Sequence, residues 1–417
     1  MGMIALMVSA EAVFVLPFVL PRVFRPTMLD VFAMTNTELG DAFSAYGLVA
    51  LCSYGVGGLL ADRFEARKLM AAALVATGVV GLGLLGEPSV SVLTALYAAW
   101  GFTTVLMYWA ALIKATREWG GEDGQGRAFG ILDGGRGLLA AVLSSVAVWA
   151  FAGLLPVDAE VASAADKAIA FRGVTIALIG FVFVAAGVVW MGMRSDKPQQ
   201  NDSPQAPRGS WQQLSAVARR PEVWLQAGIV VCSYVAFKGS DDFTLLARDG
   251  FGMDDVEAAS LGSLSFWVRP VAALGAGLLA DKVDGGRVIL VCFIALVVGD
   301  LVIWSGALPT SSTMALYMAV LGTSVFFYAL RGVYFALFEE ARLPISLTGT
   351  AVGLVSVLGY TPDVFFGPLM GRLTDSAPGM LGHQRLFGVL ALFAVAGVLC
   401  TVGFMMRVQR IKAAAPA

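Results

Sequence analysis

The chain has 417 residues, of which 58% are hydrophobic and only 14% are charged, and its mean hydropathy is +0.78. A soluble protein of this length could not bury so much apolar surface, so the composition excludes an ordinary soluble protein and favours a membrane protein. The formal net charge of −2 gives no indication of a nucleic-acid partner, and we expect none.

Apolar runs of about 20 residues, the length that crosses the core of a bilayer, occur twelve times. We therefore expect an all-α membrane protein with twelve transmembrane helices. The runs lie near residues 3–21, 41–61, 69–86, 91–112, 128–154, 170–192, 222–241, 257–280, 288–306, 312–337, 346–371 and 386–406. The first run is the weakest, because Glu11, Pro17 and Pro21 interrupt it.

One long polar stretch follows the sixth run. It holds Pro198, Pro204 and Pro207 and is rich in Gln, Asn and Ser, a composition typical of a flexible linker. We predict two pseudo-symmetric six-helix bundles, at residues 1–194 and 222–417, joined by a linker at 195–221. Far more of the 28 Lys and Arg residues fall in loops on the side of the linker and termini, so the positive-inside rule places these in the cytoplasm of a multi-pass inner-membrane (plasma-membrane) protein.

The sequence Gly-Leu-Leu-Ala-Asp ends the second run, from Gly58 to Asp62, and recurs 219 residues later, from Gly277 to Asp281. A repeat at the same point of each half indicates an internally duplicated membrane protein. An aspartate at the end of a span can face the positively polarised N-terminus of another helix, and glycines let that helix approach. The basic residues that follow the two copies are Arg63 and Arg67 in the first loop and Lys282 and Arg287 in the second.

Twelve spans, a central polar loop and a Gly-x-x-x-Asp-Arg/Lys loop after spans 2 and 8 resemble the major facilitator superfamily over essentially the whole chain. The segment from Gly349 to Asp375 resembles span 11 of its sugar-phosphate-permease and nitrate-porter-like group. This resemblance implies a monomeric secondary transporter that works by alternating access. It also implies that Asp62 faces span 11 and Asp281 faces span 5 when the cytoplasmic side is closed. The alternative is that the charges of the two loops only determine topology.

Ionisable residues within the spans are functional hypotheses, because each costs at least about 2.5–3.5 kcal/mol at the centre of a bilayer. They are Glu11, Asp133, Arg136, Lys238, Arg269, Asp300, Arg331 and Asp363. Bases outnumber acids among those after the linker, and acids outnumber bases before it. This asymmetry predicts a site for a small anion on the C-terminal half and an acidic proton carrier on the N-terminal half.

A planar guanidinium beside an aromatic ring suits recognition of a carboxylate, phosphate or nitrate. Arg269 follows Trp267 and Arg331 follows Tyr328, and we predict that both arginines contact the substrate. The predicted substrate-binding residues are Arg269, Arg331, Lys238, Tyr108, Trp267, Tyr328 and Tyr360. The alternatives are an internal ion pair for each arginine and, for Lys238, exposure to the outer water together with Asp241 and Asp242.

Two acids are candidates for proton coupling. Glu11 lies about halfway along the first span and is the first choice, and Asp363 after Pro362 is the second. The alternative for Glu11 is a permanent pair with an arginine. Asp133 and Arg136, three residues apart on one helix, can pair with each other.

The sequence therefore predicts a proton-coupled transporter, a symporter, for a small organic anion. The alternative is a proton-driven exporter of hydrophobic or cationic compounds, which would need a cavity poor in bases; Arg269 and Arg331 argue against it. A receptor with the same fold would bring an additional soluble domain, and an enzyme would need a catalytic motif. The four cysteines lie far apart in apolar runs, so we expect no metal, cofactor or catalytic residue.

Overall fold

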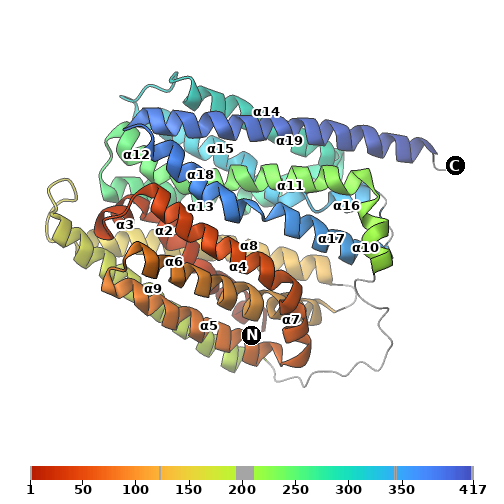
Figure 1. The fold of residues 1–417 in the computed structure, drawn as a ribbon, viewed down its shortest axis with the longest axis horizontal. Helices are drawn as coiled ribbons and strands as arrows, with labels where there is room; N and C mark the ends of the chain where they lie inside the picture. The colour runs from red at the N-terminus through yellow and green to blue at the C-terminus, as the bar shows by residue number, and fades with distance from the viewer. Residues whose placement is uncertain (1, 122–123, 194–210, 342, 344, 415–417) are drawn as a thin grey trace. The chain divides into compact units, whose positions relative to one another are not determined.

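The computed structural model describes residues 2–121, 124–193, 211–341, 343 and 345–414, and every regular element within them is a helix (Figure 1). Eleven helical segments are long and apolar enough to cross a membrane. A bent pair, Asn36–Tyr54 and Val56–Arg63, meets at 60° and adds a twelfth if the pair forms one span. The predicted all-α fold is confirmed, and each of the twelve predicted runs falls on one of these segments.

The described chain divides into two compact units by its packing. Unit 1 comprises Met1–Gln199, Asp241–Trp267 and Asp363–Gly382, and unit 2 comprises Gln200–Ser240, Val268–Pro362 and His383–Ala417. Unit 1 thus joins the first part of the chain to two segments that follow the predicted linker. The division into two six-helix bundles stays a prediction. Residues 195–210 of the predicted linker lie outside the described residues, and the rest of it contains the short helix α10, Trp211–Ala218.

Helices of unit 1 come from three stretches of the chain. Those of the first stretch are α1 (Gly2–Phe14), η1 (Val15–Val19), α2 (Leu20–Val23), α3 (Arg25–Val31), α4 (Asn36–Arg63), α5 (Ala66–Gly81), η2 (Leu82–Gly86), α6 (Val90–Gly101), η3 (Phe102–Trp109), α7 (Ala110–Gly120), α8 (Gln125–Leu154) and α9 (Ala164–Gly192). The later stretches supply α12 (Phe243–Phe251), the first part of α13 (Asp255–Val283) and α18 (Pro362–Asp375).

Unit 2 holds the remaining helices. Besides α10 and the second part of α13, these are α11 (Pro221–Gly239), α14 (Gly285–Trp304), α15 (Thr313–Val333), α16 (Leu337–Glu340), α17 (Ile345–Gly359) and nearly all of α19 (Met380–Ala414). The short 3₁₀ turn η4, Ser240–Asp242, spans the boundary between the units.

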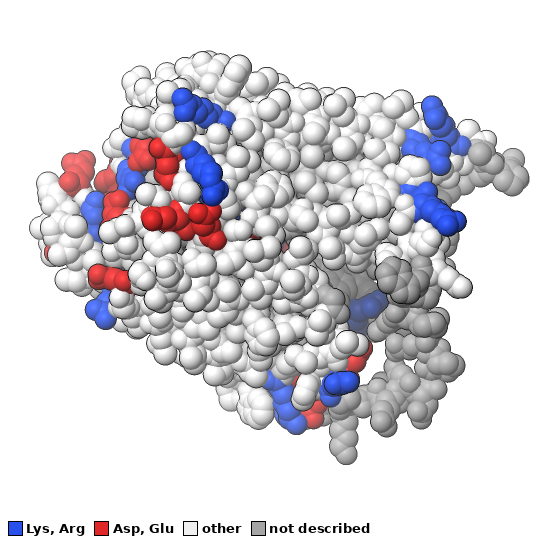
Figure 2. Space-filling view, in the orientation of Figure 1, with Lys and Arg blue, Asp and Glu red and all other residues white. Residues whose placement is uncertain are grey.

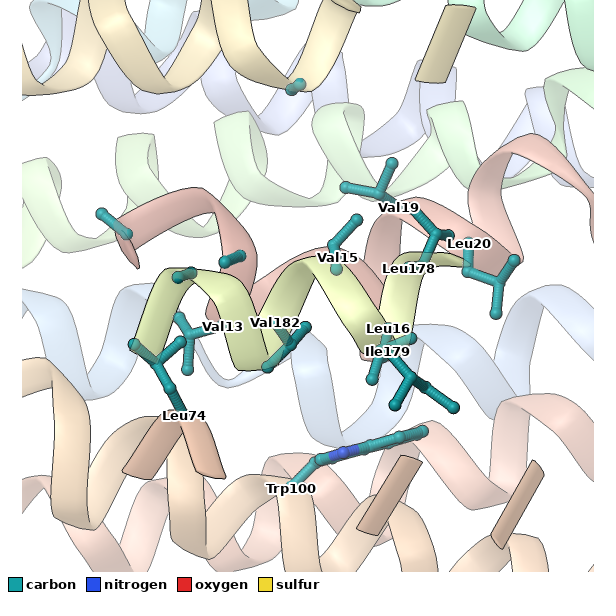
Figure 3. Close-up of a cluster of buried hydrophobic side chains, with 14 of the residues drawn as sticks. Val13, Val15, Leu16, Val19, Leu20, Leu74, Trp100, Leu178, Ile179 and Val182 are labelled. Atoms are coloured by element: carbon teal, nitrogen blue, oxygen red, sulfur yellow. The ribbon is translucent and has the colours of Figure 1, made fainter. Parts of the chain in front are cut away.

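The first span is the centre of unit 1. Of its most apolar window, 72% is buried, more than in any other span of the described chain. Figure 3 shows Val13 and Leu16 of this span beside Leu74 of α5, Trp100 of α6 and side chains of α9. A helix that other helices surround does not face lipid, which explains how this span tolerates a glutamate and two prolines.

Charged side chains mark the helix ends. On the face drawn in Figure 2, blue and red atoms gather towards the ends of the helices, and the lengths between them are almost free of charge. Reciprocal capping boxes precede several helices, among them the boxes formed by Thr35 with Glu38 before α4 and by Ser163 with Asp166 before α9. Such boxes satisfy backbone N–H groups where the chain enters the span.

Candidate solute and coupling sites

Glu11 and Arg136 form an ion pair inside unit 1. Glu11 Oε2 lies 3.6 Å from Arg136 Nε, and the two side chains are 4% and 15% exposed. This separation gives charge attraction but exceeds that of a direct hydrogen bond. The Arg136 guanidinium also lies 5.5 Å from the centre of the Phe14 ring. The pairing of Glu11 with an arginine, which the sequence left as an alternative, is therefore present in this structure.

Two spans near this pair, the first span that carries Glu11 and the fourth span, contain π-helical segments. The first span changes to a π-helix at Val15–Val19 and the fourth at Phe102–Trp109, and π segments occur preferentially at functional sites. Pro17 explains the first, because it lacks an N–H and crowds the preceding turn. In the fourth span the Tyr108 hydroxyl donates to Ser9 Oγ at 2.7 Å, and Ser9 is two residues from Glu11 in the first span. The sequence analysis missed both π segments, although Pro17 was a signal for the first.

Arg331 lies among aromatic rings in unit 2. Its guanidinium is 4.1 Å from the centre of the Phe237 ring and 5.6 Å from that of Tyr234, both on α11. Tyr234 in turn meets Tyr360 edge-on, with 5.0 Å between ring centres. Tyr328, 1% exposed, stacks obliquely on Phe327 with 4.5 Å between centres.

The structure thus brings together three predicted residues, Arg331, Tyr328 and Tyr360. It adds Tyr234 and Phe237, which the sequence analysis missed. Their spacing of three along one helix face was the available signal. We call Tyr234, Phe237, Phe327, Tyr328, Arg331 and Tyr360 the aromatic–arginine cluster.

The other predicted site residues lie outside this cluster. Trp267 belongs to unit 1, where its indole N–H donates to Ser145 Oγ at 3.0 Å, whereas Arg269 is a half-buried residue of unit 2. The helix α13 continues without a break through Pro270. Asp363, 9% exposed, sits in the first turn of α18, where the helix dipole stabilises a carboxylate.

Three charged residues for which the sequence left exposure to the outer water as an alternative are buried. Lys238 and Asp241 are each 2% exposed and Asp242 is 0% exposed, so the alternative of exposure for Lys238 is wrong. Arg22 and Arg25, which follow the end of the first predicted run, are 5% and 0% exposed. The apolar runs mark only the segments that cross the membrane, and they do not show that short helices with buried charges follow the ends of spans.

The residues around the repeated loops make contacts both within a loop and with other helices. Arg67 lies 4.9 Å from the centre of the Trp190 ring, and Arg287 pairs with Asp284 at 3.2 Å. Lys114 Nζ donates to the Ala61 carbonyl at 2.9 Å and so caps the end of α4. The repeated glycines are open, since a Cβ at Gly58 or Gly277 would meet no described atom within 4 Å. A gating role for Asp62, Asp281, Arg63 and Lys282 stays a prediction.

The family model described as Major Facilitator Superfamily matches residues 3–360, most of the chain. The chain belongs to the major facilitator superfamily. Two Escherichia coli (strain K12) relatives resemble it along most of their length. Inner membrane protein YqcE is 27% identical over 400 residues, covering 94% of this chain and 91% of the relative. Inner membrane protein YihN is 25% identical, covering 93% and 91%.

Solved structures share the fold with little sequence identity. The bacterial homologue of the human lysosomal transporter Spinster, in an inward-facing and unoccupied conformation, superposes with a TM-score of 0.74 at 13% identity, covering 100% of this chain and 98% of that one. The nucleoside transporter NupG superposes with a TM-score of 0.69 at 12% identity, covering 97% and 98%. As a member of the major facilitator superfamily, the chain is a multi-pass membrane transporter for a small-molecule solute and not an enzyme. In the described part of the chain, no cluster of His, Cys, Asp and Glu could hold a metal ion.

Proposed function

We propose that this transporter moves a small organic anion across the inner membrane by alternating access, as a monomer coupled to protons, with both termini in the cytoplasm. The observation that supports an anionic solute is the setting of Arg331. Rings of Phe237 and Tyr234 lie against the guanidinium, and cation–π contact of this kind holds the group in place. The N–H donors of a guanidinium lie in its plane, along the edges that pair with a carboxylate or phosphate.

Glu11 is the proton carrier in this proposal. It is a buried carboxylate on the most enclosed span, and Arg136 stands 3.6 Å from it. A proton taken up by Glu11 would neutralise its carboxylate and remove its attraction to Arg136. The positive charge of Arg136 would then remain in the interior of unit 1 without that attraction. Uptake and release of that proton would then be linked to the packing of α1 against α8. Asp363 is the second candidate, and Arg269 and Lys238 are further anion contacts.

The solute class also depends on the group within the superfamily. We assign the chain to the sugar-phosphate-permease and nitrate-porter-like group on the pattern from Gly349 to Asp375. The two solved structures described above share only 13% and 12% identity with the chain. The substrate class of the nucleoside transporter NupG therefore cannot be assigned to this chain.

The test of the anion is a thermal-shift screen of the purified protein in detergent. The panel holds short carboxylic acids, sugar acids, sugar phosphates, neutral sugars and tetraphenylphosphonium. A ligand at 100 times its Kd stabilises the folded state by about 2.7 kcal/mol, a shift that is easily measured. We expect an acid or a phosphate to raise the melting temperature, and Arg331→Ala to remove the rise. Arg410→Ala, an exposed arginine near the end of α19, is the matched control and should keep it. Stabilisation by tetraphenylphosphonium alone would instead support the exporter.

The test of the carrier uses the anion found in that screen. In proteoliposomes, a proton gradient should drive accumulation by the parent protein. Glu11→Gln, which keeps the size of the side chain but cannot ionise, should still bind the anion and exchange it across the membrane, but should not accumulate it. Asp300→Asn is the control for removal of a buried acid, because Asp300 is 4% exposed and belongs to unit 2. Accumulation by Glu11→Gln at the parental level would rule out Glu11 as the carrier.

A further inference from the structure

The repeat extends well beyond the Gly-Leu-Leu-Ala-Asp sequence. Thr35 Oγ1 accepts from the Glu38 N–H at 3.2 Å and the Glu38 carboxylate accepts from the Thr35 N–H at 2.8 Å, which caps α4. The same two contacts cap α13, where Asp254 Oδ1 accepts from the Glu257 N–H at 2.8 Å and Glu257 accepts from the Asp254 N–H at 3.2 Å. Each residue of the second box lies 219 residues after the corresponding residue of the first, the same offset that separates Asp281 from Asp62.

The connections before these caps match in the same register. Ala33 and Gly252, again 219 residues apart, each have a positive φ, +49° and +68° respectively. Each follows a short helix, α3 and α12, and these two helices pack on each other (Figure 1). The chain therefore runs without insertion or deletion from the short helix to the end of the long span in both repeats.

Continued towards the first span, the register pairs Arg22 with Asp241, and these two residues touch. Arg22 Nε donates to Asp241 Oδ1 at 2.5 Å, and the side chains are 6% and 3% exposed. A two-fold rotation displaces a point in proportion to its distance from the axis. Two counterpart residues can therefore touch only where they lie close to the axis that relates the repeats. Repeats of this superfamily are related by an axis along the membrane normal.

Opposite charges at counterpart positions are a specific feature of this contact. With the same residue in both repeats, two like charges would meet near the axis in a buried place. Here the Arg22 carbonyl accepts from Thr244 Oγ1 at 3.2 Å, and the guanidinium lies 5.7 Å from the centre of the Phe266 ring. The pair is thus held by segments from before and after the predicted linker, and losing either residue would remove a buried charge partner from the other.

Two exposed ion pairs lie at the same end of unit 1 as the buried Arg22–Asp241 pair. Arg248 pairs with Asp30 at 2.9 Å and Arg372 with Asp41 at 3.3 Å, each joining a residue from before the linker to one from after it. Exposed pairs of this kind contribute little. Breaking the buried Arg22–Asp241 pair is therefore expected to have a larger effect than breaking either of these exposed pairs.

We propose that the Arg22–Asp241 pair is a latch on the pseudo-two-fold axis, which holds this end of the transporter closed and separates when the end opens. The proposal rests on the alternating access proposed above but not on the identity of the solute. Arg22 and Asp241 occupy equivalent positions in the two repeats. The double variant Arg22→Asp with Asp241→Arg therefore restores an arginine–aspartate pair at the same place, with each charge now on the other repeat.

A disulfide reporter tests the latch without any solute. Ser145 Oγ on α8 and Ser263 Oγ on α13 are 3.3 Å apart, close enough for cysteines at these positions to cross-link when the end is closed. The four native cysteines are replaced by alanine, and Ser145→Cys with Ser263→Cys is added to the full chain in membranes. The rate of copper-catalysed cross-linking is followed by the loss of thiols reactive with maleimide–polyethylene glycol.

We expect Arg22→Asp and Asp241→Arg each to slow cross-linking by about tenfold, and the double exchange to return it to within about threefold of the parent. The matched control, Arg248→Asp, breaks the solvent-accessible pairs of Arg248 with Asp30 and Asp249 and should change the rate by less than about twofold. If the single variants do not fold, a folded double exchange that cross-links at the parental rate still supports the latch. Unchanged rates in the singles, or a double exchange no better than they are, would overturn it. Failure of the anion screen would leave these rates unaffected, so the two proposals fail separately.

Discussion

The glycines of α4 differ in how closely the backbone of α18 approaches them. Near the start of α4, a Cβ on Gly40 would overlap the carbonyl of Gly367 on α18, and further along a Cβ on Gly47 would lie 2.5 Å from the carbonyl carbon of Asp363. Near its end, a Cβ on Gly57 would lie 3.1 Å from the Leu106 carbonyl oxygen of η3, whereas a Cβ on Gly58 would meet no described atom within 4 Å. Helix α18 therefore packs on the glycines of the first part of α4 and leaves Gly58 uncovered. A transporter that closes its two ends in turn is expected to show this difference in any single state.

The largest expected effect comes from adding a methyl group at the packed end. Gly40→Ala places a Cβ against backbone, which cannot move aside as a side chain can, and overpacking of this kind costs about 1–3 kcal/mol or more. We expect a clear fall in the melting temperature of the purified protein. We also expect slower cross-linking between Ser145→Cys and Ser263→Cys, because α4 and α18 could no longer meet.

The matched control is Gly58→Ala on the same helix. Alanine favours a helix over glycine by about 1 kcal/mol, and there is free space for its methyl group, so the melting temperature should stay or rise. If Gly58 packs closely in the opposite state, as the family resemblance implies, Gly58→Ala should still slow transport. Equal melting temperatures for the two alanine variants would show that the difference between the ends of α4 does not affect stability.

Sequence patterns predicted the spans well, because lipid contact requires an apolar surface and the runs record it. They predicted helix ends less well, since a helix can continue into water with polar residues. The sequence analysis began the second span at 41, whereas α4 begins at Asn36 behind the Thr35–Glu38 box, and the last span at 386, whereas α19 begins at Met380. The first of these boundaries lies in polar sequence that carries a capping box rather than a hydropathy signal.

The contacts of buried charges were harder to predict. Glu11 and Arg331 were identified as intramembrane charges, but their neighbours Arg136 and Phe237 come from helices far away in the sequence. The Arg22–Asp241 contact is a partial exception. The duplication gave its offset of 219 residues, although only the structure shows that this position lies where counterparts meet.

A smaller effect at the packed end is expected from Asn36, which is 2% exposed and links three segments. Its Oδ1 accepts from Arg25 Nε at 2.7 Å, and its Nδ2 donates to Thr374 Oγ1 at 2.7 Å. Burial lowers the pKa of the Arg25 guanidinium, with the nearby Asp241 and Asp242 opposing the shift, so this cation depends on the few polar partners it has.

Asn36→Ala removes both hydrogen bonds and leaves buried donors and acceptors unsatisfied, which costs about 1–3 kcal/mol of unfolding free energy. Unfolding by sodium dodecyl sulfate should show this loss. The control at the same end is Arg372→Gln, which breaks the pair with Asp41 in which the side chains are 59% and 48% exposed, and it should cost less than about 1 kcal/mol. If both variants lose the same small amount, the packed end is held by backbone contact at its glycines, and the buried polar link contributes no more than a surface ion pair.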